Sequence, residues 1–267
     1  MAETQAGPAP APPLPPGELT IIGTGHVFQV RDTIRGAILA LRPDLVMVEL
    51  DRGRLQVLLE RQKGNVLEAK GGFIQKKLQK FQEEVAGLYG ADVGEEMLAA
   101  VQAAQEVGAK VALIDPPAED TVRRALKELT WREKFRTFGL LLKGGAQAIV
   151  GRGGKKEDLE RELKAYQDDP EKALLELKKQ FPTLYRIVIA ERDALMARRI
   201  AHLLPGVRHG VAVVGDGHVP GLVKLLDDLK PTTFRLADVR DGKLPRPVSS
   251  LATGTSDSVS FGFDSRI

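Results

Sequence analysis

Two segments of this chain, almost two hundred residues apart, carry nearly the same motif: LTIIGTGHV at 19–27 and VAVVGDGHV at 211–219. Each is an apolar run typical of a buried strand, followed by a Gly-x-Gly turn and a histidine. Glycine lets the backbone turn sharply as it leaves a sheet. In open α/β sheets, functional sites gather at this carboxyl edge of the strands. We therefore interpret His26 and His218, two of only four histidines, as a pair at one edge of a sheet.

Composition restricts the class of protein further. A chain of 267 residues with 43% hydrophobic and 28% charged residues is typical of a globular protein, and we expect one main domain. The net charge of +3, from 39 basic and 36 acidic residues, does not predict nucleic-acid binding. Cysteine is absent, so any metal ligands are nitrogen and oxygen atoms. No apolar window has the length of a membrane span and no secretory signal precedes the fold, so the default expectation is a cytoplasmic protein.

The pattern along the chain predicts an α/β fold with a small central, mostly parallel sheet flanked by helices and a long helical insertion. We expect a disordered Pro-rich arm over 1–17, the folded domain over 18–240 and a flexible tail over 241–267. Further strands are predicted at 45–50, 110–115, 211–214 and, at an edge, 233–236. Helices are predicted at 31–41, 52–62, 72–88, 95–106 and 219–229. The insertion, 118–204, reads as helical throughout, and three roles stay open for it: a lid, a contact between subunits of a homo-oligomer, or a solvated hairpin.

Acidic side chains follow the other predicted strands. Glu49 and Asp51 come at the end of the second strand, and Asp115 ends the third. If the strands are parallel, these carboxylates meet the two histidines at one edge. Ordinary alternatives exist, because Asp51 could cap the next helix and Asp115 could be a turn residue before Pro116. Glu49, which lies inside an apolar run, is harder to explain in this way.

A further candidate comes from the helix predicted around 184–204. Glu191 falls within its apolar stripe, so we expect its carboxylate to face the core, which is costly without a partner. One interpretation is a functional carboxylate. The other is a structural ion pair with a buried arginine such as Arg192 or Arg54.

Imidazole and carboxylate groups are the nitrogen and oxygen ligands that suit Zn, Mn or Co. A metal site with an open position makes bound water a nucleophile near neutral pH, and a spare carboxylate can act as general base. A dinucleotide-binding fingerprint is the rival interpretation of Gly23-x-Gly25. It fails in detail, because Phe28 stands where the third glycine is required.

The ordered motifs GTGHV, RPDLVMVELDRGRL, GGFIQKKLQK, GEEMLAAVQAAQEVGAKVALID, ERDALMARRI and VVGDGHVPGL resemble the TraB/PrgY branch of the TraB family, which is related to the TIKI proteins. The resemblance covers roughly 19–229. Its TIKI branch implies a metal-dependent peptidase that needs two Gly-x-x-His motifs and a glutamate, whereas its PrgY branch implies restraint of a peptide pheromone. Asp115-Pro116 departs from the family's usual Asp-Arg, and the membrane-spanning region of many relatives is absent from this sequence.

Taken over at matching positions, the resemblance points to His26, Glu49, Glu191 and His218, with Arg192 beside them. We expect a divalent metal (Mn, Co or Zn) on His26, His218 and Glu49. Glu191 is then the base, and Arg192 stabilises the developing oxyanion. The neighbouring candidates are Asp51, Arg54, Asp115 and Asp193. The expected partner is a peptide or small-molecule substrate, with no nucleic acid and no membrane span. The alternative is a protein that binds a peptide in the same cleft without cleaving it.

Overall fold

The computed structural model describes residues 16–25, 30–63, 94–136 and 170–246, and it contains a five-stranded sheet in the order β3-β2-β4-β1-β5. All neighbouring strands are parallel. The strands are β1 (Glu18–Thr24), β2 (Leu45–Val48), β3 (Lys110–Leu113), β4 (His209–Gly215) and β5 (Thr232–Phe234). The expected parallel α/β sheet is confirmed, and the short β5 lies at its edge beside β1.

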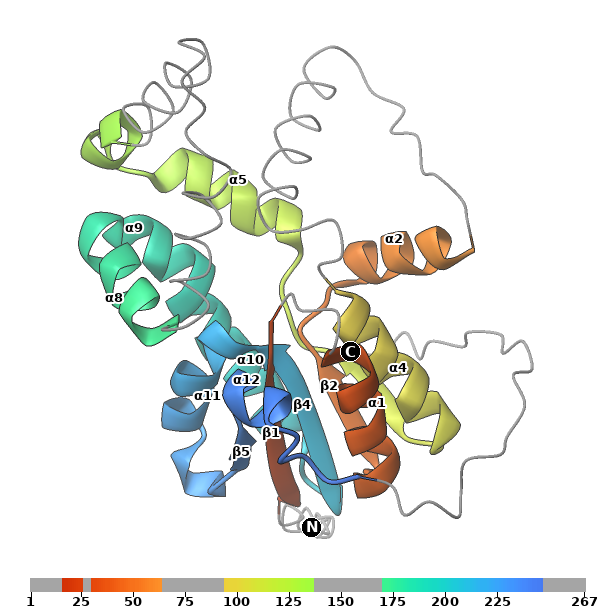
Figure 1. Cartoon of the computed structure of the whole chain (residues 1–267). Helices are drawn as coiled ribbons and strands as arrows, with labels where there is room; N and C mark the ends of the chain where they lie inside the picture. Colours follow the sequence, from red (N-terminus) through yellow and green to blue (C-terminus); the bar gives the residue numbers. More distant parts are fainter. Residues whose placement is uncertain (1–15, 26–29, 64–93, 137–169, 247–267) are drawn as a thin grey trace, which may run out of the picture.

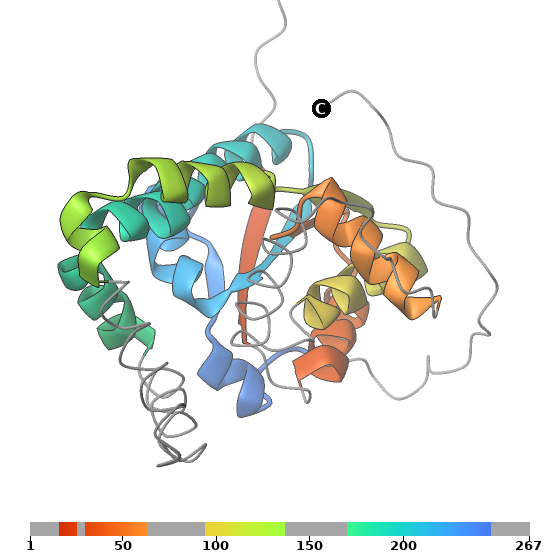
Figure 2. The same ribbon diagram turned by 90° about the horizontal axis from the view of Figure 1, so that it is seen from above.

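Helices cover both faces of the sheet (Figures 1 and 2). They are α1 (Val30–Leu41), α2 (Arg52–Gln62), α4 (Glu95–Glu106), α5 (Ala118–Glu128), α8 (Pro170–Gln180), α9 (Pro182–Tyr185), α10 (Glu191–Leu203), α11 (Val219–Leu225) and α12 (Leu236–Arg240). A π-helical turn, η1 (Arg186–Ala190), leads directly into α10, and short 3₁₀ turns, η2 (Asp216–His218) and η3 (Asp227–Leu229), flank α11. None of the described helices is long and apolar enough to cross a bilayer.

Alternate strand residues divide the core into two layers, as the period of two in a strand requires. On one face, Ile22, Val48 and Val213 pack against α1, α2, α4 and α12. On the other face, Ile21 and Met47 pack against α10 and α11. Because both faces are covered, the strands are apolar throughout, which is why they were recognisable in the sequence.

Several expectations need correction or lie outside the described residues. The helix expected over 219–229 ends at Leu225, and the segment continues as η3. Pro16 belongs to the expected arm but forms an isolated bridge with Pro205. The helix expected at 72–88, the glycine-rich part of the insertion and the tail beyond 246 lie outside the described residues. The described parts of 118–204 contain helices and no strand.

A short helical segment, 131–136, follows α5 and is anchored at its start. Thr130 and Glu133 form a capping box: the backbone N–H of Thr130 donates to Glu133 Oε2 (2.9 Å), and the N–H of Glu133 donates to Thr130 Oγ1 (3.3 Å). Glu133 Oε1 also accepts from the backbone N–H of Thr183, at 2.7 Å, and so joins this helix start to α9. Burial alone would raise the pKa of Glu133, but these hydrogen bonds outweigh it and lower the pKa to about 2.

We predict that Glu133→Gln lowers the free energy of unfolding by about 1–2 kcal/mol at neutral pH, because a buried charged acceptor is lost. Since the folded-state pKa lies below the ordinary 4.5, the contribution of Glu133 is present above pH 4.5 and is lost as the pH falls toward 2. Urea unfolding of both proteins across this range should therefore show the difference shrinking. Glu119→Gln, at an exposed position on α5, is the control; an equal effect there would contradict the assignment.

Candidate functional site

Glu49 lies at the carboxyl edge of the sheet, beside the central strand β4. It follows β2 directly, and β2 lies between β3 and β4. Its Oε2 accepts a hydrogen bond of 2.7 Å from the backbone N–H of Gly215, at the end of β4. Its Oε1 forms an ion pair with Arg192 Nη2. The carboxylate is therefore fixed by the end of the neighbouring strand β4 and by a side chain of α10.

Arg192 joins two strand ends to α10. Besides Glu49, its guanidinium donates to both oxygens of Asp115, at 2.9 and 2.7 Å, and to the carbonyl of Val188, at 3.0 Å. The side chain is only 16% exposed, so these partners replace most of its hydration. Burial by itself would raise the pKa of Glu49, but the charges of His218 and Arg192 hold it well below its ordinary value.

His218 is held on both sides of its ring. Its Nδ1 lies 2.5 Å from Asp193 Oδ1, so Nδ1–H donates to that carboxylate, and its Nε2 lies 3.3 Å from Glu49 Oε1. Burial would lower the pKa of His218, but the Glu49 carboxylate and the hydrogen bond to Asp193 outweigh it and raise the pKa to about 9. His218 thus lies in ion-pair contact with two carboxylates, those of Asp193 and Glu49.

The expected neighbours Asp51, Arg54 and Asp115 extend this network outward. Asp51 caps α2 by accepting a hydrogen bond from the backbone N–H of Arg54 (3.1 Å), so the helix-cap interpretation of this residue is confirmed. The same carboxylate also accepts from Arg54 Nε (2.6 Å). Arg54 in turn forms an ion pair with Asp115. Asp115, 4% exposed, is thus more than a turn residue, because it lies between two arginines.

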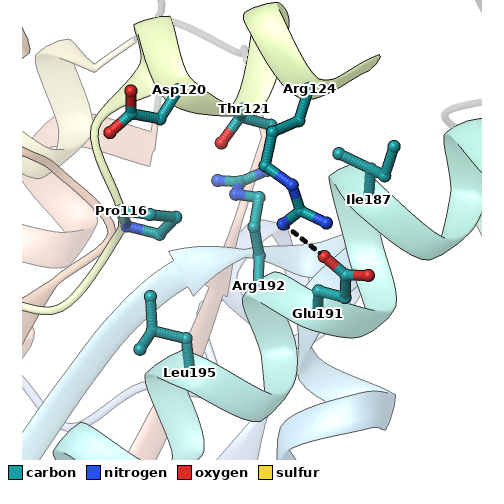
Figure 3. Close-up of a pocket in the computed structure, with 8 residues that line it drawn as sticks. All are labelled: Pro116, Asp120, Thr121, Arg124, Ile187, Glu191, Arg192 and Leu195. Atoms are coloured by element: carbon teal, nitrogen blue, oxygen red, sulfur yellow. Dashed lines mark hydrogen bonds and ion pairs between the residues drawn. The ribbon is translucent and has the colours of Figure 1, made fainter. Parts of the chain in front are cut away.

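Glu191 is not where the helical pattern placed it. Its side chain is 34% exposed and forms ion pairs with Arg124 of α5, at 2.6 Å, and with Arg186 of η1. It lines a surface pocket between α5 and α10, where Figure 3 shows Glu191 and Arg124 facing each other. The expectation that this carboxylate faces the core is wrong. One reason is the π-helical turn just before it, which breaks the 3.6-residue periodicity on which the expectation rested.

The two repeated motifs lie side by side. β1 and β4 pair in parallel, with Gly23 opposite Val214 and Thr24 opposite Gly215. A Cβ atom on Gly23 would lie 2.4 Å from Asp216 Oδ1, so this glycine allows the second turn to approach the first. The buried Asp216 carboxylate is paired with Arg235, whose Nε and Nη2 each donate a hydrogen bond of 2.9 Å to it. His26 itself lies outside the described residues.

Besides Asp216, sequence reasoning missed a second buried carboxylate in this region. Glu96, in the first turn of α4, is 7% exposed. Burial raises the pKa of Glu96 to about 7, and the nearby charge of Glu49 adds to the rise. Hydrogen bonds from the backbone N–H groups of Glu96 and Gly94 lower the pKa but do not outweigh burial. An acidic residue in the first turn of a helix is common, so nothing in the sequence distinguished Glu96 from Glu95 beside it.

The fold and the site together define an α/β protein with a cluster of carboxylate, arginine and histidine side chains at the carboxyl edge of a parallel sheet. The sequence model of the TraB/PrgY/gumN family matches residues 16–236, and the chain belongs to this family. It is 31% identical over 228 residues to an uncharacterized protein of Methanocaldococcus jannaschii, covering 80% of this chain and 54% of that protein. It is 28% identical over 240 residues to TraB domain-containing proteins of Bos taurus and Homo sapiens, covering 76% of this chain and 61% of each. The chain thus spans little more than half the length of these relatives.

We predict that Arg192→Met lowers the free energy of unfolding by about 3–5 kcal/mol, because two largely buried carboxylates lose their shared cation. Urea or thermal unfolding measures the change. Arg208→Met is the matched control, since Arg208 also pairs with an aspartate, Asp44, but is 88% exposed. A similar loss in both variants would show that the buried network has no special weight.

Proposed function

We propose that the cluster around Glu49 and His218 is a divalent metal site of a hydrolase, and that its substrate is a peptide, as in the TIKI branch that the sequence resembles. The observation that carries the proposal is the arrangement of His218. Its Nδ1 is fixed by a carboxylate while its Nε2 is directed at a second carboxylate, 3.3 Å away. Histidine ligands of metals are typically oriented by such a carboxylate on the other ring nitrogen.

The donor chemistry suits a metal. Two ligand atoms on tetrahedral Zn²⁺, each about 2.0–2.1 Å from the ion, are about 3.3 Å apart, as Nε2 of His218 and Oε1 of Glu49 are. Within the described residues no group of three His, Asp or Glu side chains could hold a metal, and His26, the third expected ligand, lies outside them. In this proposal His218, Glu49 and His26 hold the ion, which when bound lowers the pKa of a coordinated water and polarises a carbonyl.

The protein's own residues have distinct parts in the proposed reaction. Asp193 keeps the Nδ1 proton on His218 and leaves Nε2 for the ion. Arg192 places positive charge beside Glu49, where it can stabilise an oxyanion. Glu191 is the proposed base, although Arg124 and Arg186 hold its pKa below the ordinary value, so it must release them to accept a proton. Glu96, with a pKa of about 7, is the competing candidate for the base.

A second function, peptide binding without cleavage as in the PrgY branch, is favoured by a different observation. Both oxygens of Glu49 already have protein partners, Arg192 and Gly215. In the described residues every buried side-chain nitrogen and oxygen has a hydrogen-bond partner. A network whose polar atoms all have hydrogen-bond partners can hold the strand ends together without binding a metal and without catalysing a reaction.

The test is metal binding by the purified full chain after removal of metals with a chelator. We expect about one Mn²⁺, Co²⁺ or Zn²⁺ per chain by calorimetry, with a higher melting temperature by mass action. His218→Ala and His26→Ala should abolish both effects. His209→Ala should not, because His209 lies at the opposite end of β4 and contacts Thr20. No binding by the wild type, or equal binding by His218→Ala, contradicts the metal site.

Catalysis is tested by digestion of a peptide library with the metal-loaded protein, read by mass spectrometry. Glu191→Gln and Glu96→Gln are compared, and the true base should lose about a hundredfold or more in kcat with metal affinity retained. Glu128→Gln is the control, since Glu128 pairs with Arg124 and Arg186 in the same way as Glu191. Metal binding with no cleavage of any peptide would favour the binding protein over the hydrolase.

A further inference from the structure

Two aromatic rings stand out from the surface just after α5. Trp131, the only tryptophan of the chain, is 76% exposed, and Phe135 is 68% exposed. They are four residues apart on one helical segment, so they share a face, and their ring centroids are 6.0 Å apart. Large apolar side chains that are exposed together indicate an interaction surface more strongly than scattered ones do.

This pair is displayed on a fixed backbone. The capping box of Thr130 and Glu133 sets the start of the helix, and Glu133 binds the backbone of Thr183 on the side away from the rings. Arg136 Nη1 also donates to the carbonyl of Gln180, at 2.6 Å. The inner side of the segment is thus attached to the end of α8 and to α9, while the rings are exposed.

Basic side chains border the rings on both sides. Arg132 and Lys134 are exposed, and Lys134 Nζ lies 5.7 Å from the centroid of the Trp131 ring. The only acidic side chain between Trp131 and Arg136 is Glu133, which is 3% exposed and directed inward. The solvent-facing side of this segment therefore combines aromatic rings with positive charge and no negative charge.

We propose that the surface formed by Trp131, Arg132, Lys134 and Phe135, here the Trp131 surface, binds peripherally to an anionic phospholipid bilayer. Aromatic rings prefer the boundary between headgroups and acyl chains, and lysine and arginine beside them attract anionic headgroups. The charge complementarity favours a lipid surface over a second copy of this chain, which would bring the same basic rim against itself. The proposal is independent of the proposed hydrolase function.

One helix, α5, connects the Trp131 surface to the pocket beside the candidate site. α5 runs from the end of β3 across the pocket that contains Arg192 and Glu191, and the Trp131 surface follows its C-terminal end (Figures 1 and 3). Two more exposed apolar side chains, Val122 and Leu126, lie on α5 itself.

The experiment uses the full chain and the fluorescence of its single tryptophan, with vesicles of phosphatidylcholine alone or mixed with phosphatidylserine. We expect Trp131 emission to shift to shorter wavelength, and the protein to sediment with vesicles, when phosphatidylserine is present. The affinity for neutral vesicles should be at least about tenfold weaker. High salt should reverse the binding, because screening removes the charge attraction.

A matched pair of double variants tests the surface. Lys134→Glu with Phe135→Ser should weaken binding to the anionic vesicles at least about tenfold. Lys224→Glu with Leu225→Ser removes the same kinds of side chain from α11, where both are exposed, and should leave binding unchanged. Equal melting temperatures of the variants and the wild type confirm that both still fold.

Three results would overturn the proposal. The first is an emission spectrum that anionic vesicles do not change. The second is emission already at short wavelength without lipid; if it depends on protein concentration, a second copy covers the rings, and otherwise the chain itself covers them. The third is an equal loss of vesicle binding in both double variants, which would mean that no specific surface is responsible.

Discussion

The buried guanidinium of Arg192 is the interaction on which the rest of the site depends. Two parallel strands end in carboxylates, Glu49 after β2 and Asp115 after β3, and these would repel each other at the sheet edge without a cation between them. Arg192 enters from α10 and binds both. Because α10 also packs on one face of the sheet through Met196 and Ile200, the ion pairs and the apolar core fix the same helix.

The same helix orients the histidine. Asp193, the next residue along α10, binds Nδ1 of His218, and so one turn of helix positions both the arginine and the imidazole against Glu49. The packing there is close: a Cβ atom on Gly221 of α11 would lie 2.0 Å from Asp193 Oδ2. The positions of the side chains at this site are therefore set by how α10 and α11 pack, and not by the strand ends alone.

The sequence was sufficient to predict the strands and most of the cluster, because buried parallel strands are apolar throughout and a polar residue at their ends is conspicuous. Glu49, Asp115 and His218 were found in this way, Arg192 came from the family resemblance, and all four lie together. Glu191 was misplaced, because an extra residue in a π-helical turn rotates the helix face and leaves no mark in an apolar pattern. Glu96 could not be found, since its burial depends on how α4 meets the sheet edge, which is a property of tertiary packing.

The measurement that tests the metal site most directly is an anomalous difference map from crystals of the full chain grown with Mn²⁺. We predict a single strong peak within about 2.0–2.2 Å of Nε2 of His218 and of an oxygen of Glu49, with Nδ1 still bound to Asp193. A map with no peak there, and with Glu49 still in contact with both His218 and Arg192 as in the present structure, would contradict the metal site.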